Sequence, residues 1–282
     1  DGRWYMVSLG KRNDLDGDAN MGRETYLIPM KWEPTIVKWQ QVSETKWEPV
    51  RYLFPVAAPL SGKVERFFPL PFPEKPQYIN NSYIDDFTSS NLKLDWTFIR
   101  VPKQNTISLT DNPGHLRLYP QSTTIENRKN FSMIGFRQRE SDFDYQVKMN
   151  FMPKKNKVES GIIHYQKERN YLTSVVYKVG KKFFLEQMLK EKDKNVTSLK
   201  KVHLKKYSGS IIFKTESRED RYTFYYSLDN GETFTSFNSI DAIKMLDRNY
   251  TGALLGMYAT SNGVSSKDYA DFDWIRYNDF IR

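Results

Sequence analysis

The chain has 282 residues, of which 39% are hydrophobic and 15% aromatic, so it is long enough for one or two domains with real cores and is not disordered. It contains no cysteine, which excludes disulfides, thiolate metal sites and cysteine nucleophiles. No stretch approaches the roughly 20 apolar residues of a membrane helix, and the first residues lack the pattern of a signal peptide, so we expect no membrane partner.

The net charge is +9, from 43 Lys and Arg against 34 Asp and Glu. The basic residues fall in short clusters beside expected turns and strand ends, which favours solvated loop lysines over contact with nucleic acid. Four N-x-S/T sequons begin at Asn80, Asn130, Asn195 and Asn249. They favour a secreted, glycosylated protein over a cytoplasmic one.

Residues 3–10 and 23–30 are predicted to be two strands joined by the polar loop "KRNDLDGDAN". A single hairpin of this size is too small to bury a core alone. The loop invites comparison with an EF-hand, but with Asp14 at position one, position six is Ala19 instead of Gly and position twelve is Thr25. We therefore interpret it as a solvated loop.

Prolines recur through residues 32–81, with apolar and aromatic residues between them. Such a segment cannot be a helix and is not expected to form a central strand. Its many aromatic side chains are unusual for a free linker. We expect an extended connector that lies along a surface.

From residue 83 onward, short strand-like runs follow one another at regular spacing, each bounded by Gly, Asn, Asp or charged turns. In one of them Tyr222, Phe224 and Tyr226 share one face, and the next turn carries Asn230-Gly231, a strong hairpin signal. Only residues 239–246 have helical spacing. The pattern predicts an all-β, two-sheet sandwich of jelly-roll type.

Two carboxylates, Asp271 and Asp273, lie two residues apart in "ADFDWIRY", so we expect both on one strand face and Phe272 and Trp274 on the other. Three interpretations stay open. The pair could belong to a polar face matched by Arg or Lys, could bind a structural Ca²⁺ together with the Asp85-Asp86 pair, or could serve as acid and base in glycoside hydrolysis. For the calcium interpretation the candidate ligands are Asp86 and Asp273.

Few other residues in the sequence suggest a catalytic or binding role. His115, His164 and His203 share no ligand spacing, and each is expected to be an ordinary strand or loop residue. No complete catalytic set is recognisable. Aromatic residues between polar ones, in "YQKERNYLTSVVYKVGKKFF" and "YTFYYSLD", could stack on sugar rings or could simply fill the core between two sheets.

Several motifs resemble glycoside hydrolase family 43. In order and spacing, "DNPGHLRLYP", "GIIHYQKERNYLTSVVYKV", "RYTFYYSLDNGETFTSF", "YTGALLGMYA" and "ADFDWIRY" resemble the C-terminal concanavalin A-like sandwich of its β-xylosidases, and "DDFTSSNLKLDWTFIR" resembles the start of that domain. "DGRWYMVSLGKR" and "NMGRETYLIPMKW" resemble the last part of the family's five-bladed β-propeller. The resemblance covers nearly the whole chain.

The resemblance implies inverting hydrolysis of xylosides or arabinofuranosides, with an Asp as base, a Glu as acid and a further Asp that orients the acid. These carboxylates belong to earlier propeller blades, and Glu24 lies outside their motifs. In the family, the arginine of the Gly-Arg-Glu motif holds the sugar, which implies this role for Arg23. An aromatic residue of a sandwich loop narrows the family's pocket, which implies Tyr250 as a second substrate-binding residue.

The main hypothesis is thus the C-terminal part of a family 43 enzyme that acts in xylan degradation and is inactive alone. Its expected parts are residues 1–33, the end of the propeller, residues 34–81, a connector, and residues 82–282, the sandwich. A stand-alone module that binds xylan or xylo-oligosaccharides is the alternative. We expect xylan or xylo- and arabino-oligosaccharides and the rest of the propeller as partners, and no required cofactor beyond a structural Ca²⁺. The sequence leaves a homo-oligomer open.

Overall fold

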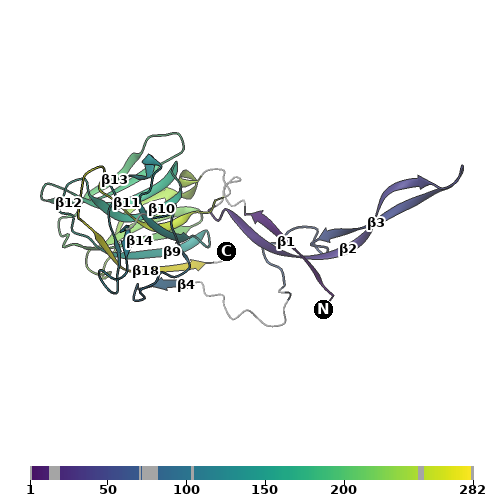
Figure 1. Cartoon of the computed structure of the whole chain (residues 1–282), viewed down its shortest axis with the longest axis horizontal. Helices are drawn as coiled ribbons and strands as arrows, with labels where there is room; N and C mark the ends of the chain where they lie inside the picture. The colour runs from purple at the N-terminus through teal and green to yellow at the C-terminus, as the bar shows by residue number, and fades with distance from the viewer. Residues whose placement is uncertain are drawn as a thin grey trace. The chain divides into compact units, whose positions relative to one another are not determined.

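The computed structural model describes residues 2–12, 20–69, 71, 82–102, 105–246 and 251–280. It divides into two compact units, which are described one at a time (Figure 1). The first comprises Asp1–Lys11 and Arg23–Ile79, and the second comprises Arg12–Gly22 and Asn80–Arg282.

The first unit contains a three-stranded antiparallel sheet in the order β1-β2-β3. Its strands are β1 (Trp4–Lys11), β2 (Arg23–Gln41) and β3 (Trp47–Ala57). The predicted N-terminal hairpin is confirmed, because β1 pairs with β2 from Trp4 opposite Met30 to Lys11 opposite Arg23.

Much of the proline-rich segment, expected to be an extended connector, forms strands, because β2 extends to Gln41 and β3 spans Trp47–Ala57. The pairing register explains how β2 accommodates Pro29 and Pro34. β2 pairs with β1 up to Met30 and with β3 from Met30 onward. Each proline therefore has a partner strand on one side only, and the missing N–H costs no ladder hydrogen bond when it faces the open side.

The sheet of the first unit buries very little. Apart from Pro71, the buried apolar side chains among its described residues are Ile28 and Ala58. Many large apolar side chains are exposed instead. They include Trp4, Leu9, Trp32, Trp39, Trp47 and Phe54.

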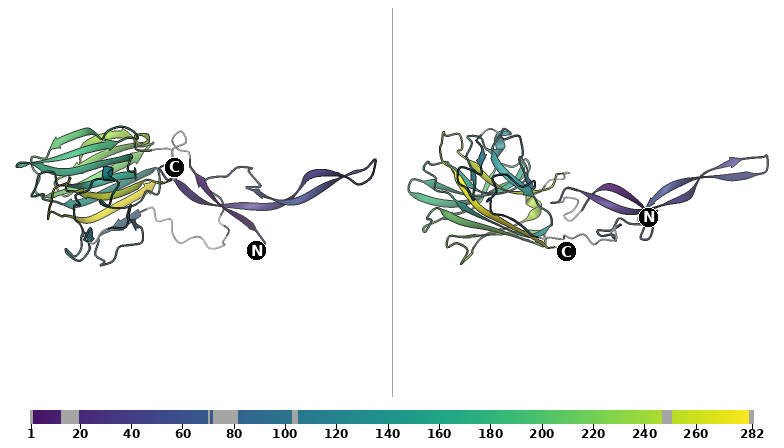
Figure 2. Two further views of the ribbon diagram at one scale, coloured as in Figure 1. Left: turned by 45° about the horizontal axis from the view of Figure 1, so that its top comes forward. Right: turned by 60° about the horizontal axis from the view of Figure 1, so that its bottom comes forward.

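The second unit is a sandwich of two antiparallel sheets, seen from two sides in Figure 2. One sheet has seven strands in the order β13-β12-β11-β10-β17-β8-β5. The other has eight, in the order β16-β15-β14-β9-β18-β7-β6 with β4 paired to β18. The predicted all-β sandwich is confirmed.

The strands of the seven-stranded sheet are β5 (Trp96–Thr97), β8 (Ser132–Arg137), β10 (Glu159–Lys167), β11 (Asn170–Val179), β12 (Lys182–Lys190), β13 (Thr197–His203) and β17 (Leu254–Thr260). The strands of the eight-stranded sheet are β4 (Ser82–Asp85), β6 (Ile107–Ser108), β7 (Leu116–Leu118), β9 (Asp142–Asn150), β14 (Ser210–Arg218), β15 (Arg221–Ser227), β16 (Thr235–Asp241) and β18 (Ala270–Phe280).

The main core lies between the two sheets. Strand β9 alternates strictly between buried and partly buried residues, so Phe143, Tyr145, Val147 and Met149 all enter the core. A smaller cluster, which includes Phe131, Tyr165 and Tyr258, packs on the outer face of the seven-stranded sheet. One sheet is thus apolar on both faces, whereas the other keeps a polar outer face.

The turns and short helices agree in part with the predictions made from the sequence. The Asn230-Gly231 turn connects β15 to β16, and both residues have positive φ, 59° and 93°. The segment 239–246, expected to be helical, ends β16 and then forms the 3₁₀ helix η2 (Ala242–Met245). A second 3₁₀ helix, η1 (Ile125–Asn127), precedes β8. In the part of the chain that the structure describes, no helix is long and apolar enough to cross a membrane.

One strand departs from simple alternation. The pairing of β18 with β9 shifts between Phe272 and Trp274, so Asp273 is the extra residue of a bulge. Phe272 and Ile275 lie in the core, and Trp274 packs against Arg276, whose guanidinium carbon is 4.3 Å from the indole centroid. The expectation that Phe272 and Trp274 share a face is therefore wrong, because the bulge reverses the alternation.

Candidate functional site

Arg23 is the first residue of β2 and stands opposite Lys11 at the mouth of the hairpin. Its side chain is exposed, and the neighbouring Glu24 is half-buried opposite Gly10. The strand entrance thus presents a guanidinium group at its edge.

The three residues before Arg23 pack on the sandwich. The Ala253 N–H donates to the carbonyl of Asn20 over 2.6 Å, and the Arg137 guanidinium donates to the carbonyl of Met21. Gly252 leaves no space for a side chain, because a Cβ there would lie 2.7 Å from the Met21 carbonyl oxygen. Residues 20–22 and 252–253 therefore form one tightly packed contact, here called the Asn20–Ala253 contact.

This contact connects the sequence neighbourhoods of the two predicted substrate-binding residues. Arg23 follows Gly22 directly, and Tyr250 stands two residues before Gly252. Tyr250 itself lies outside the described residues. Its predicted role stays a prediction, as does that of Arg23.

The two candidate calcium ligands have different interaction partners. Asp86 is exposed and accepts hydrogen bonds from the backbone N–H and hydroxyl of Thr88, which lower the pKa of its carboxyl group. Asp273 forms an ion pair with Lys148 at 2.9 Å. Among the described residues, no group of three or more His, Asp or Glu side chains is arranged to hold a metal ion. Calcium binding by Asp86 and Asp273 stays a prediction.

Asp85 and Asp271 each have well-defined partners. Asp85 is 4% exposed and accepts a 2.7 Å hydrogen bond from the Trp96 indole N–H. Asp271 forms a bidentate pair with Arg117, with Nε–Oδ1 and NH2–Oδ2 distances of 2.7 and 2.8 Å. The pairs Asp271–Arg117 and Asp273–Lys148 correspond to the polar-face interpretation of the two carboxylates.

The histidines are not arranged for catalysis in the described structure. His164 is 1% exposed, lies among Tyr145, Tyr222 and Phe224, and has no hydrogen-bond partner for either ring nitrogen. Burial lowers its pKa from 6.5 to about 3, so the ring is neutral at physiological pH. His164 is a core residue, as expected.

The aromatic residues considered as a sugar platform divide between core and surface. Tyr165, Tyr171, Tyr222 and Phe224 are buried. Tyr177 is half-buried, and its hydroxyl donates to Glu186 over 2.5 Å. Tyr222 and Phe224 fill the core between the two sheets, whereas Tyr165 and Tyr171 belong to the apolar cluster on the outer face of the seven-stranded sheet.

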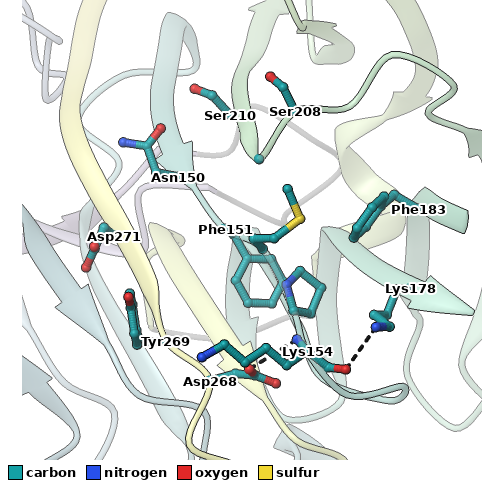
Figure 3. Close-up of a pocket in the computed structure, with 13 residues that line it drawn as sticks. Asn150, Phe151, Lys154, Lys178, Phe183, Ser208, Ser210, Asp268, Tyr269 and Asp271 are labelled. Carbon is teal, nitrogen blue, oxygen red and sulfur yellow. Dashed lines mark hydrogen bonds between the residues drawn. The ribbon is translucent and has the colours of Figure 1, made fainter. Parts of the chain in front are cut away.

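A concave site with a volume of about 800 Å³ lies at one end of the sandwich and is lined by residues of both sheets (Figure 3). It is here called the end pocket. Its lining combines apolar and polar residues. They are Asn150, Phe151, Met152, Pro153, Lys154, Lys178, Phe183, Ser208, Gly209, Ser210, Asp268, Tyr269 and Asp271.

Strand register brings a polar row to this pocket. Ser210 of β14 pairs with Asn150 of β9, Asn150 pairs with Asp271 of β18, and Asp271 pairs with Arg117 of β7. In each strand the next residue in sequence, such as Ile211, Phe272 or Leu118, is a core residue. The four polar side chains therefore share the outer face of the sheet, in four adjacent strands.

The sequence indicated only one member of this row. Asp271 was singled out for its spacing from Asp273, whereas Asn150, Ser210 and Tyr269 were not. Alternation in "YQVKMN" shows that Asn150 points away from the core, but only the strand order places it beside Asp271. Pairing between strands 121 residues apart carries no local signal.

Comparison with known proteins gives consistent matches. Residues 84–278 match the family described as the beta xylosidase C-terminal concanavalin A-like domain. The non-reducing end alpha-L-arabinofuranosidase BoGH43B of Bacteroides ovatus is 30% identical over 280 residues, which are 98% of this chain and 49% of that protein. A xylosidase/arabinosidase of Butyrivibrio fibrisolvens is 27% identical over 97% of this chain and 49% of that protein.

Solved structures agree. The Bacteroides ovatus xyloglucan PUL GH43B structure superposes with a TM-score of 0.83 and 26% identity, over 99% of this chain and 52% of that chain. The GH43 BlXynB structure from Bacillus licheniformis gives a TM-score of 0.81 and 25% identity, over 99% and 51%. The chain thus spans about half the length of the relatives it matches.

Proposed function

This chain belongs to glycoside hydrolase family 43, and we propose that it is the C-terminal part of a β-xylosidase or α-L-arabinofuranosidase that acts in xylan degradation. One observation carries the proposal. Nearly all of this chain matches only about half of each relative, with 98% of the chain against 49% of the Bacteroides ovatus arabinofuranosidase. The matched region includes the sandwich and the sheet that precedes it.

The exposed apolar side chains of β1–β3 support the same proposal. A sheet that leaves Trp4, Trp32 and Trp39 exposed has too little core to be stable by itself. We propose that these strands are the last part of a five-bladed propeller and that the preceding blades cover them. The resemblance places the general acid and the general base in those blades.

In this proposal Arg23 binds substrate. A guanidinium group offers five N–H donors in a planar fork, which suits both sugar hydroxyls and a catalytic carboxylate. Tyr250 would narrow the same pocket from the sandwich side.

The genomic or transcript sequence immediately upstream of Asp1 tests the proposal. We expect an open reading frame in phase with Asp1 that encodes the earlier blades, of about the same length as this chain because the relatives are about twice as long. An in-frame stop codon directly before Asp1, with no coding exon upstream, would contradict it.

A second function, a module that binds xylan or xylo-oligosaccharides without hydrolysing them, is favoured by the end pocket. Affinity electrophoresis in a xylan-containing gel tests it. Retarded migration of this chain relative to a gel without xylan would support the binding function, and unchanged migration would count against it.

A further inference from the structure

We propose that the end pocket of the sandwich is a binding site for neutral oligosaccharides. The inference rests on the second function proposed above and deepens it, by naming the class of ligand and the residues that bind it, and it is independent of the chain being part of a hydrolase. It rests on the polar row across the outer face of the eight-stranded sheet, on the tyrosine ring beside that row, and on the balanced charges around them.

The polar row offers donors and acceptors at regular spacing. Ser210, Asn150 and Asp271 stand side by side in three adjacent strands, and Figure 3 shows all three among the residues around the pocket. Adjacent strands are about 4.8 Å apart, so the three groups extend over about 10 Å. A hydroxyl, a carboxamide and a carboxylate in such a row can bind successive sugar hydroxyls.

Asp271 is held in one orientation with acceptor capacity to spare. Arg117 donates to both of its carboxylate oxygens, and the Asn112 side-chain amide donates to Oδ2 over 2.9 Å. An ionised carboxylate has about four acceptor positions, and these three hydrogen bonds use three of them. Because Arg117 fixes the side chain, little rotamer entropy is lost when a ligand binds.

Tyr269 supplies an aromatic face. The residue is 42% exposed and lines the pocket beside Asp271. The guanidinium carbon of Arg117 is 3.8 Å from its ring centroid, so one face of the ring is covered and held by a cation–π contact. The other face can pack against the apolar C–H surface of a sugar ring.

The pocket walls are anchored before any ligand binds. The Phe151 N–H donates to the Gly209 carbonyl over 2.7 Å, and Asp268 accepts hydrogen bonds from the backbone N–H groups of Lys154 and Lys155. The Lys178 ammonium group donates to the Lys154 carbonyl over 2.9 Å. Two loops are thereby fixed around the polar row, and a preformed site is typical of small-ligand pockets.

The charges favour a neutral ligand. The lining holds two lysines, Lys154 and Lys178, and two aspartates, Asp268 and Asp271. The lining therefore has no excess of positive charge that would select a phosphate or a sugar acid. A neutral sugar can bind through the hydrogen-bonding groups of the row alone.

Isothermal titration of the full chain with xylotetraose, arabinotetraose, cellotetraose and mannotetraose tests the inference. We expect at least one of them to bind, and Tyr269→Ala to weaken that binding by about tenfold or more, because the stacking face is lost. Tyr269→Phe should keep most of the affinity, since the ring remains.

Phe280→Ala is the matched control. Phe280 is also 42% exposed, lies at the opposite end of β18 and is covered by the Arg218 guanidinium at 4.4 Å. Its loss should leave binding unchanged. Circular dichroism establishes that each variant is folded, and Asn150→Ala replaces Tyr269→Ala if the latter is not. The inference is overturned if none of the four oligosaccharides binds at millimolar concentration, or if binding survives both Tyr269→Ala and Asn150→Ala.

Discussion

Gly252 shows how a single position holds the Asn20–Ala253 contact together. A Cβ at this position would lie 2.7 Å from the Met21 carbonyl oxygen and 2.9 Å from Nε of Arg137. We expect Gly252→Ala to lower the free energy of unfolding by about 1–3 kcal/mol through overpacking. Hydrogen exchange of the Ala253 amide, which donates to Asn20, should accelerate.

Gly263→Ala is the control for adding a methyl group elsewhere. Gly263 has a φ of 83° and nothing within 4 Å of the position of a Cβ, so the change adds backbone strain without a clash. The Ala253 amide should exchange as slowly as in the unchanged protein. Equal acceleration in both variants would mean that the packing at Gly252 is not what holds the contact.

His164 makes stability depend on pH. Its pKa is about 3 in the folded protein and 6.5 when unfolded, so the unfolded state binds more protons between these values. The folded state is therefore favoured above pH 6.5, and this contribution is lost as the pH falls toward 3. Between pH 7 and pH 4 the loss is about 3 kcal/mol, an order-of-magnitude value.

Urea unfolding of His164→Leu at both pH values measures this effect. The variant should lose less stability on acidification than the unchanged protein, because it has no buried imidazole to protonate. His203, an exposed histidine of β13, provides the comparison, and His203→Leu should leave the acid sensitivity caused by the buried His164 in place. If both variants respond to acid alike, the buried ring is not the cause.

Arg23 can be tested in the complete enzyme that we propose. Arg23→Ala should lower kcat/KM by about 30-fold to 1000-fold, the effect of removing a charge-assisted donor from a sugar or a catalytic carboxylate. Arg51→Ala is the matched control, since Arg51 is an exposed arginine of the same sheet. Loss of activity in both variants would point to a structural cause instead of a role in binding.

At the scale of elements, the β1–β3 sheet should be the least stable part of the chain. It has few buried side chains, whereas the sandwich has a large core. We expect brief trypsin treatment to cut within β2 and β3, at Lys38 and Arg51, before it cuts β9 at Lys148. Mass spectrometry of the fragments measures the order, and early cleavage at Lys148 would contradict this assignment.

The elements also show what sequence patterns can predict. Alternation along β9, the hairpin of β1 and β2 and the Asn230-Gly231 turn were predicted because each depends on residues close in sequence. The bulge at Asp273 and the long proline-containing strand β2 were not, because a bulge and an open strand side depend on the partner strand.

The candidate sites also differ in whether they depend on residues close in sequence or on strand pairing. Arg23 came from a local motif, and the structure places it as the first residue of β2, while its substrate-binding role stays a prediction. The end pocket joins Asn150, Ser210 and Asp271 through pairings of β9 with β14 and β18. Such long-range register is determined by the whole core, so a pocket built on it cannot be read from a single chain without the fold.

At the scale of the whole molecule, the two parts of the chain have different tasks in the proposed enzyme. The sandwich is the β-xylosidase C-terminal concanavalin A-like domain, with its own large core and the end pocket. The sheet before it carries Arg23 and exposes apolar residues that we assign to contact with earlier blades. In this account the acid and the base that cleave the glycosidic bond come from those blades.

The most direct test of this central claim is a hydrolysis assay of the 282-residue chain on p-nitrophenyl β-D-xyloside and p-nitrophenyl α-L-arabinofuranoside. We predict no turnover above the rate without protein, because an arginine in the role proposed for Arg23 cannot supply the proton transfers that break the bond. Clear turnover by this chain alone, abolished by Arg23→Ala, would show that the acid and base lie within it and would contradict the account.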